Sequence, residues 1–230
     1  ENDKRLLDKL TNENVNFKYP NAINPTLANM SFTVHPGQFI AIIGRSGSGK
    51  GTQAELLLKY LKENDPERKG IYVETGQRFR DFIGSDNYTA RHVKDVLGRG
   101  GLLPAFLPIW IWTQLLVDEM TGNEHIVLDG VSRRANEAPI IDSAMQFYDR
   151  EKVHIILLDV PRDESKGRLI KRGRSDDHPE KIDQRLDWYE TDVVHAVNFF
   201  KEHSYYTFLN INGHQPIEKV HADLIAAMGI

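Results

Sequence analysis

The residues with the clearest chemical potential form a glycine-rich segment, GRSGSGKG, at 44–51. An apolar, β-branched run over 38–44 precedes it, and a segment with helical periodicity follows. Glycines let successive backbone N–H groups turn toward phosphate oxygens, and a helix start adds a favourable dipole. Lys50 can then reach the outer phosphates of a nucleoside triphosphate. The pattern predicts a phosphate-binding loop.

The position after Lys50 departs from the general phosphate-loop pattern. Ser or Thr usually stands there and binds magnesium, whereas this chain has Gly51 followed by Thr52. Because Mg²⁺ keeps its waters readily, a metal held by phosphates and water would suffice. We therefore expect Mg²⁺ to bind together with ATP.

Strand and helix patterns alternate around this loop. The apolar strand patterns cover 38–44, 70–75, 125–130, 153–160 and 206–213. Such alternation predicts an α/β fold with three α/β/α layers and a parallel central sheet. The helix predicted over 52–64 presents an apolar face formed by Leu56, Leu57, Tyr60 and Leu61.

Composition excludes several functional classes. The chain has 230 residues, a formal net charge of −4 and no cysteine. The charge argues against broad electrostatic binding to nucleic acid, and the absent cysteines rule out disulfides and thiol catalysis. The most apolar stretch, 101–116, is shorter than the ~20 residues of a membrane span and predicts a buried helix instead. We expect a cytoplasmic monomer that binds neither nucleic acid nor membrane.

From residue 38 onward, the order and spacing of motifs resemble the adenylate kinase family of nucleoside monophosphate (NMP) kinases. The segment GSGKGTQ carries the resemblance first, and other matches follow. These are ETGQRFR at 74–80, GRGGLLP at 98–104, LDGVSRR at 128–134, GRLIKRGRSDDHPEKIDQRL at 167–186 and NGHQPIEKV at 212–220. The resemblance implies a kinase domain over 38–230, with a helical NMP-binding insertion at 76–120 and a short lid at 172–178.

On the donor side, the resemblance implies a site for ATP. Its residues would be Ser46, Gly47, Ser48, Gly49, Lys50, Gly51, Thr52, Arg168, Arg172 and Gln215. By resemblance, Arg168 and the loop with Gln215 lie near the adenine, and Arg172 lies near the phosphates. Asp129, at the end of a buried strand, would orient magnesium-bound water.

On the acceptor side, the resemblance implies a site for the monophosphate. Its residues would be Thr75, Gly76, Arg80, Leu102, Leu103, Gly130, Arg133, Glu137, Arg174 and Arg185. Arg80 and Arg133 would bind the acceptor phosphate, while Leu102 and Leu103 would border its base.

The chemistry of phosphoryl transfer explains these cations independently of the resemblance. Two polyphosphates must approach despite their repulsion, and catalysis rests on positioning and charge stabilisation. Arginine suits this role because its planar fork binds phosphate bidentately. The expected catalytic set is Lys50, Arg133, Arg172, Arg174 and Arg185, with Asp176 and Asp177 hinging or capping the lid.

The acceptor base is less clear from the sequence. The family has Gln four residues after the phosphate-binding Arg, where this chain has Glu137. A carboxylate accepts but does not donate, so GMP, CMP or UMP remain alternatives to AMP. A nucleotide-binding ATPase module is a further alternative, although such a protein needs no second arginine set at Arg80 and Arg133.

Residues 1–37 precede the resemblance and predict an extension with a short helix at 4–10 and a β-ribbon. Locally, this opening resembles that of an ABC-transporter ATPase, in which an aromatic residue at the position of Tyr19 stacks on adenine. Downstream the chain has no LSGGQ-type signature and no apolar strand that ends in Asp-Glu. Stacking of Tyr19 on the donor base is therefore a hypothesis for this segment alone.

Overall fold

The computed structural model describes residues 10–17, 27–34, 37–99, 101–150, 153–174, 177–203 and 205–230, with backbone alone for the first two ranges. In the N-terminal part, β1 (Leu10–Phe17) pairs antiparallel with β2 (Leu27–Val34) in a separate two-stranded sheet. The helix predicted at 4–10 lies outside the described residues except for Leu10, which begins β1. Tyr19 also lies outside them.

The centre of the molecule is a five-stranded sheet in the order β4-β5-β3-β6-β7, in which neighbouring strands pair in parallel. Its strands are β3 (Phe39–Ile43), β4 (Gly70–Glu74), β5 (His125–Asp129), β6 (Val153–Asp159) and β7 (Tyr206–Asn212). This confirms the predicted parallel sheet. Because the strands are parallel, their carboxyl ends meet at one edge, where ligands of open α/β sheets usually bind.

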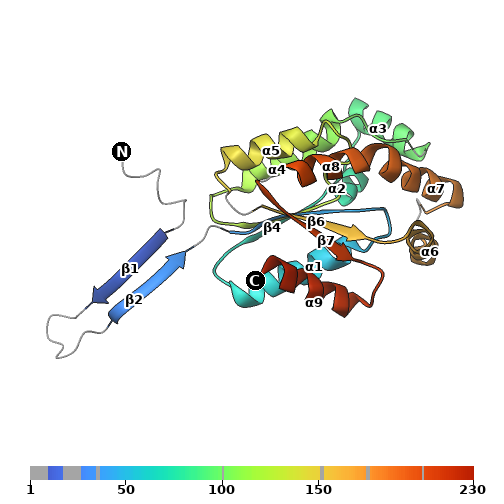
Figure 1. Ribbon diagram of the computed structural model, residues 1–230. Helices are drawn as coiled ribbons and strands as arrows, with labels where there is room; N and C mark the ends of the chain where they lie inside the picture. Colours follow the sequence, from blue (N-terminus) through green and yellow to red (C-terminus); the bar gives the residue numbers. More distant parts are fainter. Residues whose placement is uncertain are drawn as a thin grey trace.

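Helices cover both faces of the sheet (Figure 1). One face packs against α4 (Phe106–Glu119), α5 (Ala138–Phe147) and α8 (Val194–Glu202), and the other against α1 (Lys50–Asn64) and α9 (Ile217–Met228). This is the predicted three-layer α/β/α architecture.

Strand β3 shows how the sequence builds these layers. Phe39 and Ala41 belong to the core on the α4 side, whereas Ile40 and Ile42 belong to the core on the α1 side. Successive side chains of a strand point to opposite faces, so a strand between two helical layers must be apolar throughout.

The buried face of α1 differs in part from the prediction. Leu57 and Leu61 are buried as expected, but Gln53 and Ala54 take the remaining buried positions, while Leu56 and Tyr60 are half-buried. The face is displaced because α1 packs against α9 as well as the sheet, and Gln53 Nε2 donates a hydrogen bond to the Ile217 carbonyl at 3.0 Å.

A helical insertion between β4 and β5 has its own small core. It comprises α2 (Thr75–Phe82), α3 (Tyr88–Gly98) and the first half of α4, which meet at Phe79, Val93, Leu103, Leu107 and Ile111. The second half of α4 instead belongs to the core of the central sheet.

Helix α4 is two-faced rather than wholly buried as predicted for 101–116. Trp112 has no exposed surface, but Phe106 is 64% exposed and Val117 is 73% exposed. No helix in the described part of the chain is long and apolar enough to cross a membrane.

At the end of the molecule near the strand carboxyl ends, α6 (Arg162–Arg172) packs against α7 (Pro179–Trp188). Leu169, Ile182 and Leu186 form a small apolar cluster between them. Helix α7 runs through a π-helical turn, η1 (Tyr189–Val193), into α8, whereas the sequence pattern predicts regular helix there.

Candidate active site

A cleft of about 1060 Å³ opens between the sheet edge, the helical insertion and the α6–α7 pair. The predicted ATP-binding, acceptor-binding and catalytic residues and Asp129 all line this cleft, except Gly130. Segments from distant parts of the chain therefore meet around one space, as phosphoryl transfer between two nucleotides requires.

The phosphate-binding loop connects β3 to α1 at the cleft. Lys50 Nζ donates hydrogen bonds to the Gly44 carbonyl at 3.1 Å and to the Arg45 carbonyl at 2.9 Å. Burial lowers the pKa of Lys50 to about 8, and this effect outweighs the opposing charge of Asp129. Gly47 has φ of 82°, and a Cβ there would lie 2.5 Å from the Ser165 carbonyl oxygen, so only glycine fits.

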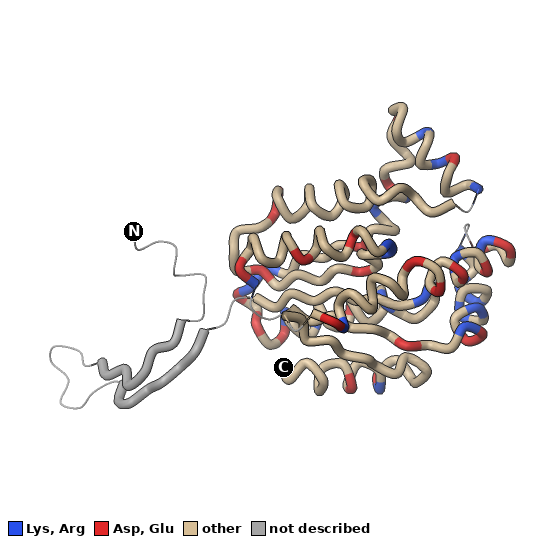
Figure 2. The backbone as a smooth tube through the Cα atoms, turned by 45° about the horizontal axis from the view of Figure 1, so that its top comes forward, with Lys and Arg blue, Asp and Glu red and all other residues tan. Residues whose placement is uncertain are grey.

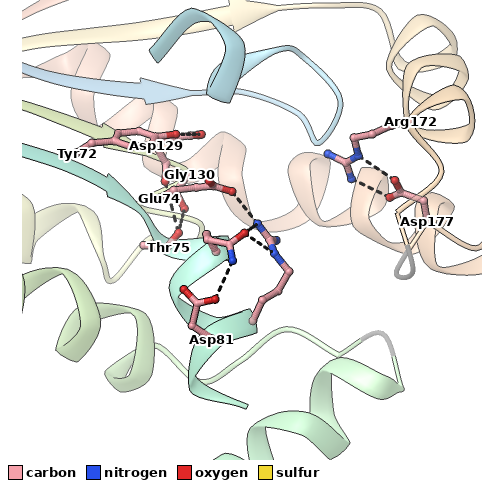
Figure 3. Close-up of polar contacts among 10 residues, drawn as sticks. Tyr72, Glu74, Thr75, Asp81, Asp129, Gly130, Arg172 and Asp177 are labelled. Atoms are coloured by element: carbon pink, nitrogen blue, oxygen red, sulfur yellow. Dashed lines mark hydrogen bonds and ion pairs between the residues drawn. The ribbon is translucent and has the colours of Figure 1, made fainter. Parts of the chain in front are cut away.

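Asp129 ends β5 and faces the start of α1. Tyr72 Oη donates to Asp129 Oδ2 at 3.2 Å (Figure 3). Burial raises the pKa of Asp129, although the charge of Lys50 opposes the change. A Cβ on Gly51 would lie 3.5 Å from Asp129 Oδ2, so the missing side chain leaves space beside the carboxylate. A hydrated magnesium ion fits this combination of carboxylate and open space.

Arg133 is fixed by main-chain contacts. Its Nε donates to the Gly130 carbonyl at 3.0 Å, and Thr75 Oγ1 donates to the same oxygen at 3.0 Å. Gly130 has φ of 69°, and a Cβ there would lie 3.2 Å from Arg133 Nη2. Burial lowers the pKa of Arg133. Gly130 thus does not line the cleft. Its carbonyl oxygen accepts the hydrogen bonds from Arg133 and Thr75, and its missing side chain leaves room for the Arg133 guanidinium.

Arg80, on α2, is held by side chains that the sequence analysis did not single out. Its Nη2 donates to Glu74 Oε1 at 2.9 Å, and its Nε donates to Gln77 Oε1 at 3.0 Å. Glu74 ends β4 opposite Asp129, which is its partner in the parallel pairing of β4 and β5.

Glu137 lies in the cleft wall with only 1% of its surface exposed. Its Oε2 accepts a hydrogen bond from the Arg133 backbone N–H at 3.1 Å. Burial raises the pKa of Glu137, although the Arg133 N–H and the nearby arginines oppose the change. One oxygen of this carboxylate therefore orders the Arg133 loop and is not directed to an acceptor base.

In the predicted lid region, Asp177 accepts hydrogen bonds from Arg172, Arg174 and Arg185. Its side chain is fully buried and accepts bidentate hydrogen bonds from Arg172, both at 2.8 Å (Figure 3). It also accepts one from Arg185 at 2.6 Å. Its Oδ2 also accepts from the Arg174 backbone N–H at 3.1 Å. Burial acts to raise the pKa of Asp177, but the arginine hydrogen bonds prevail and lower it to about 2. Asp176 lies outside the described residues.

Arg168 and Gln215, which the sequence predicts to lie beside the donor, both line the cleft. Arg168 Nη2 donates to the Gly213 carbonyl at 3.0 Å, and Gln215 Nε2 donates to the Asn212 carbonyl at 2.9 Å. The first contact connects α6 to the loop after β7, and the second joins that loop to the last residue of β7. Figure 2 shows that charged residues of both signs crowd along the helices at this end of the molecule.

Comparison with known proteins supplies the deciding observation. The model of the adenylate kinase family matches residues 42–205. The chain belongs to the adenylate kinase family. It is 31% identical over 194 residues to adenylate kinase of Phocaeicola vulgatus, covering 82% of this chain and 97% of that protein. Adenylate kinases of Prochlorococcus marinus (30%, 74% of this chain and 88% of that one) and Thermus thermophilus (27%, 84% and 98%) are also similar.

Sequence reasoning missed several groups of this adenylate kinase-family cleft. The family pattern Ser-Thr-Gly-Asp-x-x-Arg has Ser and Asp where this chain has Glu74 and Gln77, and both departures contact Arg80. The departure from the family pattern at Glu74 and Gln77 was the feature of the sequence that could have indicated these contacts. Nothing in the sequence marked Tyr72 or Lys181 in this way, because the family resemblance assigns no role to either residue.

Proposed function

We propose that this chain transfers the terminal phosphoryl group of ATP to AMP, which yields two molecules of ADP. The observation that carries the proposal is the meeting of Lys50, Arg80, Arg133, Arg172 and Arg185 around one cleft. A module that only binds or hydrolyses ATP has no use for cations at both ends of such a space.

For the donor, we propose that the loop over 46–52 surrounds the ATP phosphates with backbone N–H groups, while Lys50 contacts the outer two phosphates. Arg172, Arg174 and Arg185 stabilise the group in transfer from the lid side, and Arg168 and Gln215 border the adenine. Ser165 and Leu169 pack against Gly47 and support the connection between the loop and α6.

For the acceptor, we propose that Arg80 and Arg133 bind the AMP phosphate, with Thr75 and Gly76 beside it and Leu102 and Leu103 near the base. An ionised phosphate oxygen attacks the γ-phosphorus, and the bond from that phosphorus to the β-phosphate oxygen breaks. No general base is needed because the attacking oxygen carries no proton.

Magnesium bound with ATP would offset the negative charge of the phosphates. We propose that Asp129 holds the waters of this ion, and that Tyr72 orients the carboxylate. Lys50 keeps its position through the Gly44 and Arg45 carbonyls, which leaves its charge directed into the cleft.

Glu137 supports the acceptor site mainly through Arg133. Because its Oε2 accepts from the Arg133 N–H, we infer that it orders the phosphate-binding loop. Contact of its other oxygen with the acceptor base stays a prediction. A monomeric, cytoplasmic state and a kinase domain over 38–230 behind an extension at 1–37 also stay predictions.

A coupled assay of ADP formation tests the function. The purified chain is mixed with ATP and magnesium and with AMP, GMP, CMP or UMP in turn. We expect AMP to be strongly preferred. Strong preference for another monophosphate would overturn the acceptor assignment, and ATP hydrolysis without transfer to any of them would overturn the kinase assignment.

A further inference from the structure

Glu74 lies where acceptor phosphate binding is proposed, although no matched family position assigns it a role. It ends β4 and directly precedes Thr75, the first residue of α2. Its carboxylate is partly exposed to the cleft and accepts the 2.9 Å hydrogen bond from Arg80 (Figure 3). The Glu74 carboxylate therefore pairs with Arg80, one of the two arginines proposed to bind the acceptor phosphate.

The space above Gly76 shows how close these groups are. A Cβ built on Gly76 would lie 3.4 Å from Arg80 Nη1, 3.9 Å from Arg133 Nη2 and 3.8 Å from Glu74 Oε1. The carboxylate thus shares one small space with both guanidinium groups. Carboxylate and phosphate bind the arginine fork in the same way, so both compete for the same donors.

The chemistry of this competition depends on charge. A serine, as in the family pattern, could accept a hydrogen bond from Arg80 but would leave its positive charge uncompensated. Glu74 compensates the charge of Arg80 until a phosphate that binds Arg80 more strongly displaces the carboxylate. An AMP phosphate, with further contacts through its nucleoside, can displace the carboxylate more readily than a free anion without such contacts.

We propose that Glu74 competes with the acceptor phosphate for Arg80 and thereby sets the affinity of the acceptor site for phosphate groups. This inference rests on the proposed function of the cleft. Because AMP and a free phosphate must displace the same carboxylate from Arg80, Glu74 weakens the binding of both by a similar factor. AMP offsets this loss through its nucleoside contacts, whereas a free phosphate has no such contacts and binds only weakly.

The test compares Glu74→Gln and Glu74→Ser with the wild type. Calorimetry without ATP gives the AMP dissociation constant, and steady-state kinetics gives KM for AMP, KM for ATP and inhibition by inorganic phosphate. We expect both variants to bind AMP roughly fivefold more tightly. The gain is that of one charge-assisted hydrogen bond from Arg80 to the phosphate, reduced because the pair is partly exposed to solvent. Inorganic phosphate should inhibit them at a roughly fivefold lower concentration, because it competes with the same carboxylate, with KM for ATP nearly unchanged.

Glu63→Gln is the matched control. Glu63 is an exposed carboxylate on the outer surface of α1 and pairs with Lys59 at 3.8 Å, so the variant removes the same charge away from the cleft. It should leave all four constants unchanged.

The two variants separate competition from mere ordering of Arg80. If Glu74 only orders Arg80, both variants bind AMP more weakly or equally and phosphate inhibition does not increase, which overturns the inference. Failure of the proposed function has a different signature, because the wild type itself would then transfer no phosphoryl group to AMP.

Discussion

The cations beside the sheet edge and those on the outer helices α2 and α6 are held by different kinds of partner. Lys50 and Arg133, here called the floor cations, hydrogen-bond to main-chain carbonyls. Arg80 and Arg172, here called the rim cations, pair with the carboxylates of Glu74 and Asp177 respectively; Arg185 joins the latter pair. A carbonyl orients a cation without compensating its charge, whereas a carboxylate does both.

This difference suggests different roles for the two sets of cations. The floor cations lie in the buried interior near the proposed site of the reacting phosphates, and burial lowers the pKa of Lys50 and of Arg133. The rim cations sit in ion pairs that a phosphate can exchange or reorganise. Floor variants should therefore impair turnover most, while rim variants should change binding, order and stability.

The largest effect is expected for the floor variant Lys50→Met. It removes the cation closest to the phosphates while retaining an unbranched chain of similar length. We expect kcat to fall by about a thousandfold, the upper range for loss of one preorganised electrostatic partner, measured in the coupled ADP assay. Lys59→Met, an exposed position on the same helix, is the control and should retain wild-type kcat. A loss below tenfold would remove the distinction between floor and rim.

A smaller effect, on stability, is expected for the rim variant Asp177→Asn. The wild-type carboxylate has its folded pKa lowered to about 2, below the value of about 3.9 in an unfolded chain. Its stabilising contribution is thus complete above pH 4 and disappears as pH falls through 2. We expect the variant to lose about 2 kcal/mol of unfolding free energy at pH 7.

Denaturant unfolding at several pH values measures this contribution. The difference between wild type and Asp177→Asn should shrink between pH 4 and pH 2, since protonation removes the same charge as the substitution. A difference that stays constant over this interval would show that the lid carboxylate is not the ionised partner of Arg172 and Arg185.

The smallest effect concerns the protonation of Lys50. With a pKa of about 8 in the free protein, Lys50 loses its proton between pH 7 and pH 9, and bound phosphates should restore the charged form. ATP affinity should therefore fall about fourfold from pH 7 to pH 8.5, with proton uptake on binding above pH 8. Calorimetry in buffers of different ionisation enthalpy measures both quantities. Lys50→Arg should lose this pH dependence, and its persistence in that variant would assign it to another group.

The strands and the phosphate-binding loop could be predicted because their signals are local. The buried run before 44–51 has no polar position, which is typical of a central parallel strand, and glycines and Lys50 mark the loop directly. Arg80, Arg133 and Arg172 were predicted through the resemblance of their motifs to the adenylate kinase family. The same resemblance implied that they meet at one site.

The remaining features depend on contacts between distant residues. The π-helical turn η1 interrupts a continuous helical pattern, and the Arg45 guanidinium lies 4.1 Å from the ring centroid of Tyr189 at that turn. No local pattern announces such a contact. Helix α5 was not predicted, although Ala138, Ile141 and Met145 have helical spacing and are buried. The hydrogen bonds that Arg80 donates to Glu74 and that the Arg133 backbone N–H donates to Glu137 depend on side-chain orientation, which spacing does not specify.

The central claim is that the two floor cations serve different substrates in one reaction. The most direct test is Arg133→Ala, assayed for turnover with ATP and AMP and, separately, for ATP binding by calorimetry. The account predicts that turnover falls about a hundredfold, as for loss of a preorganised phosphate contact, while ATP affinity stays nearly unchanged. Equal losses in turnover and in ATP affinity would contradict it, because Arg133 would then act on the donor nucleotide.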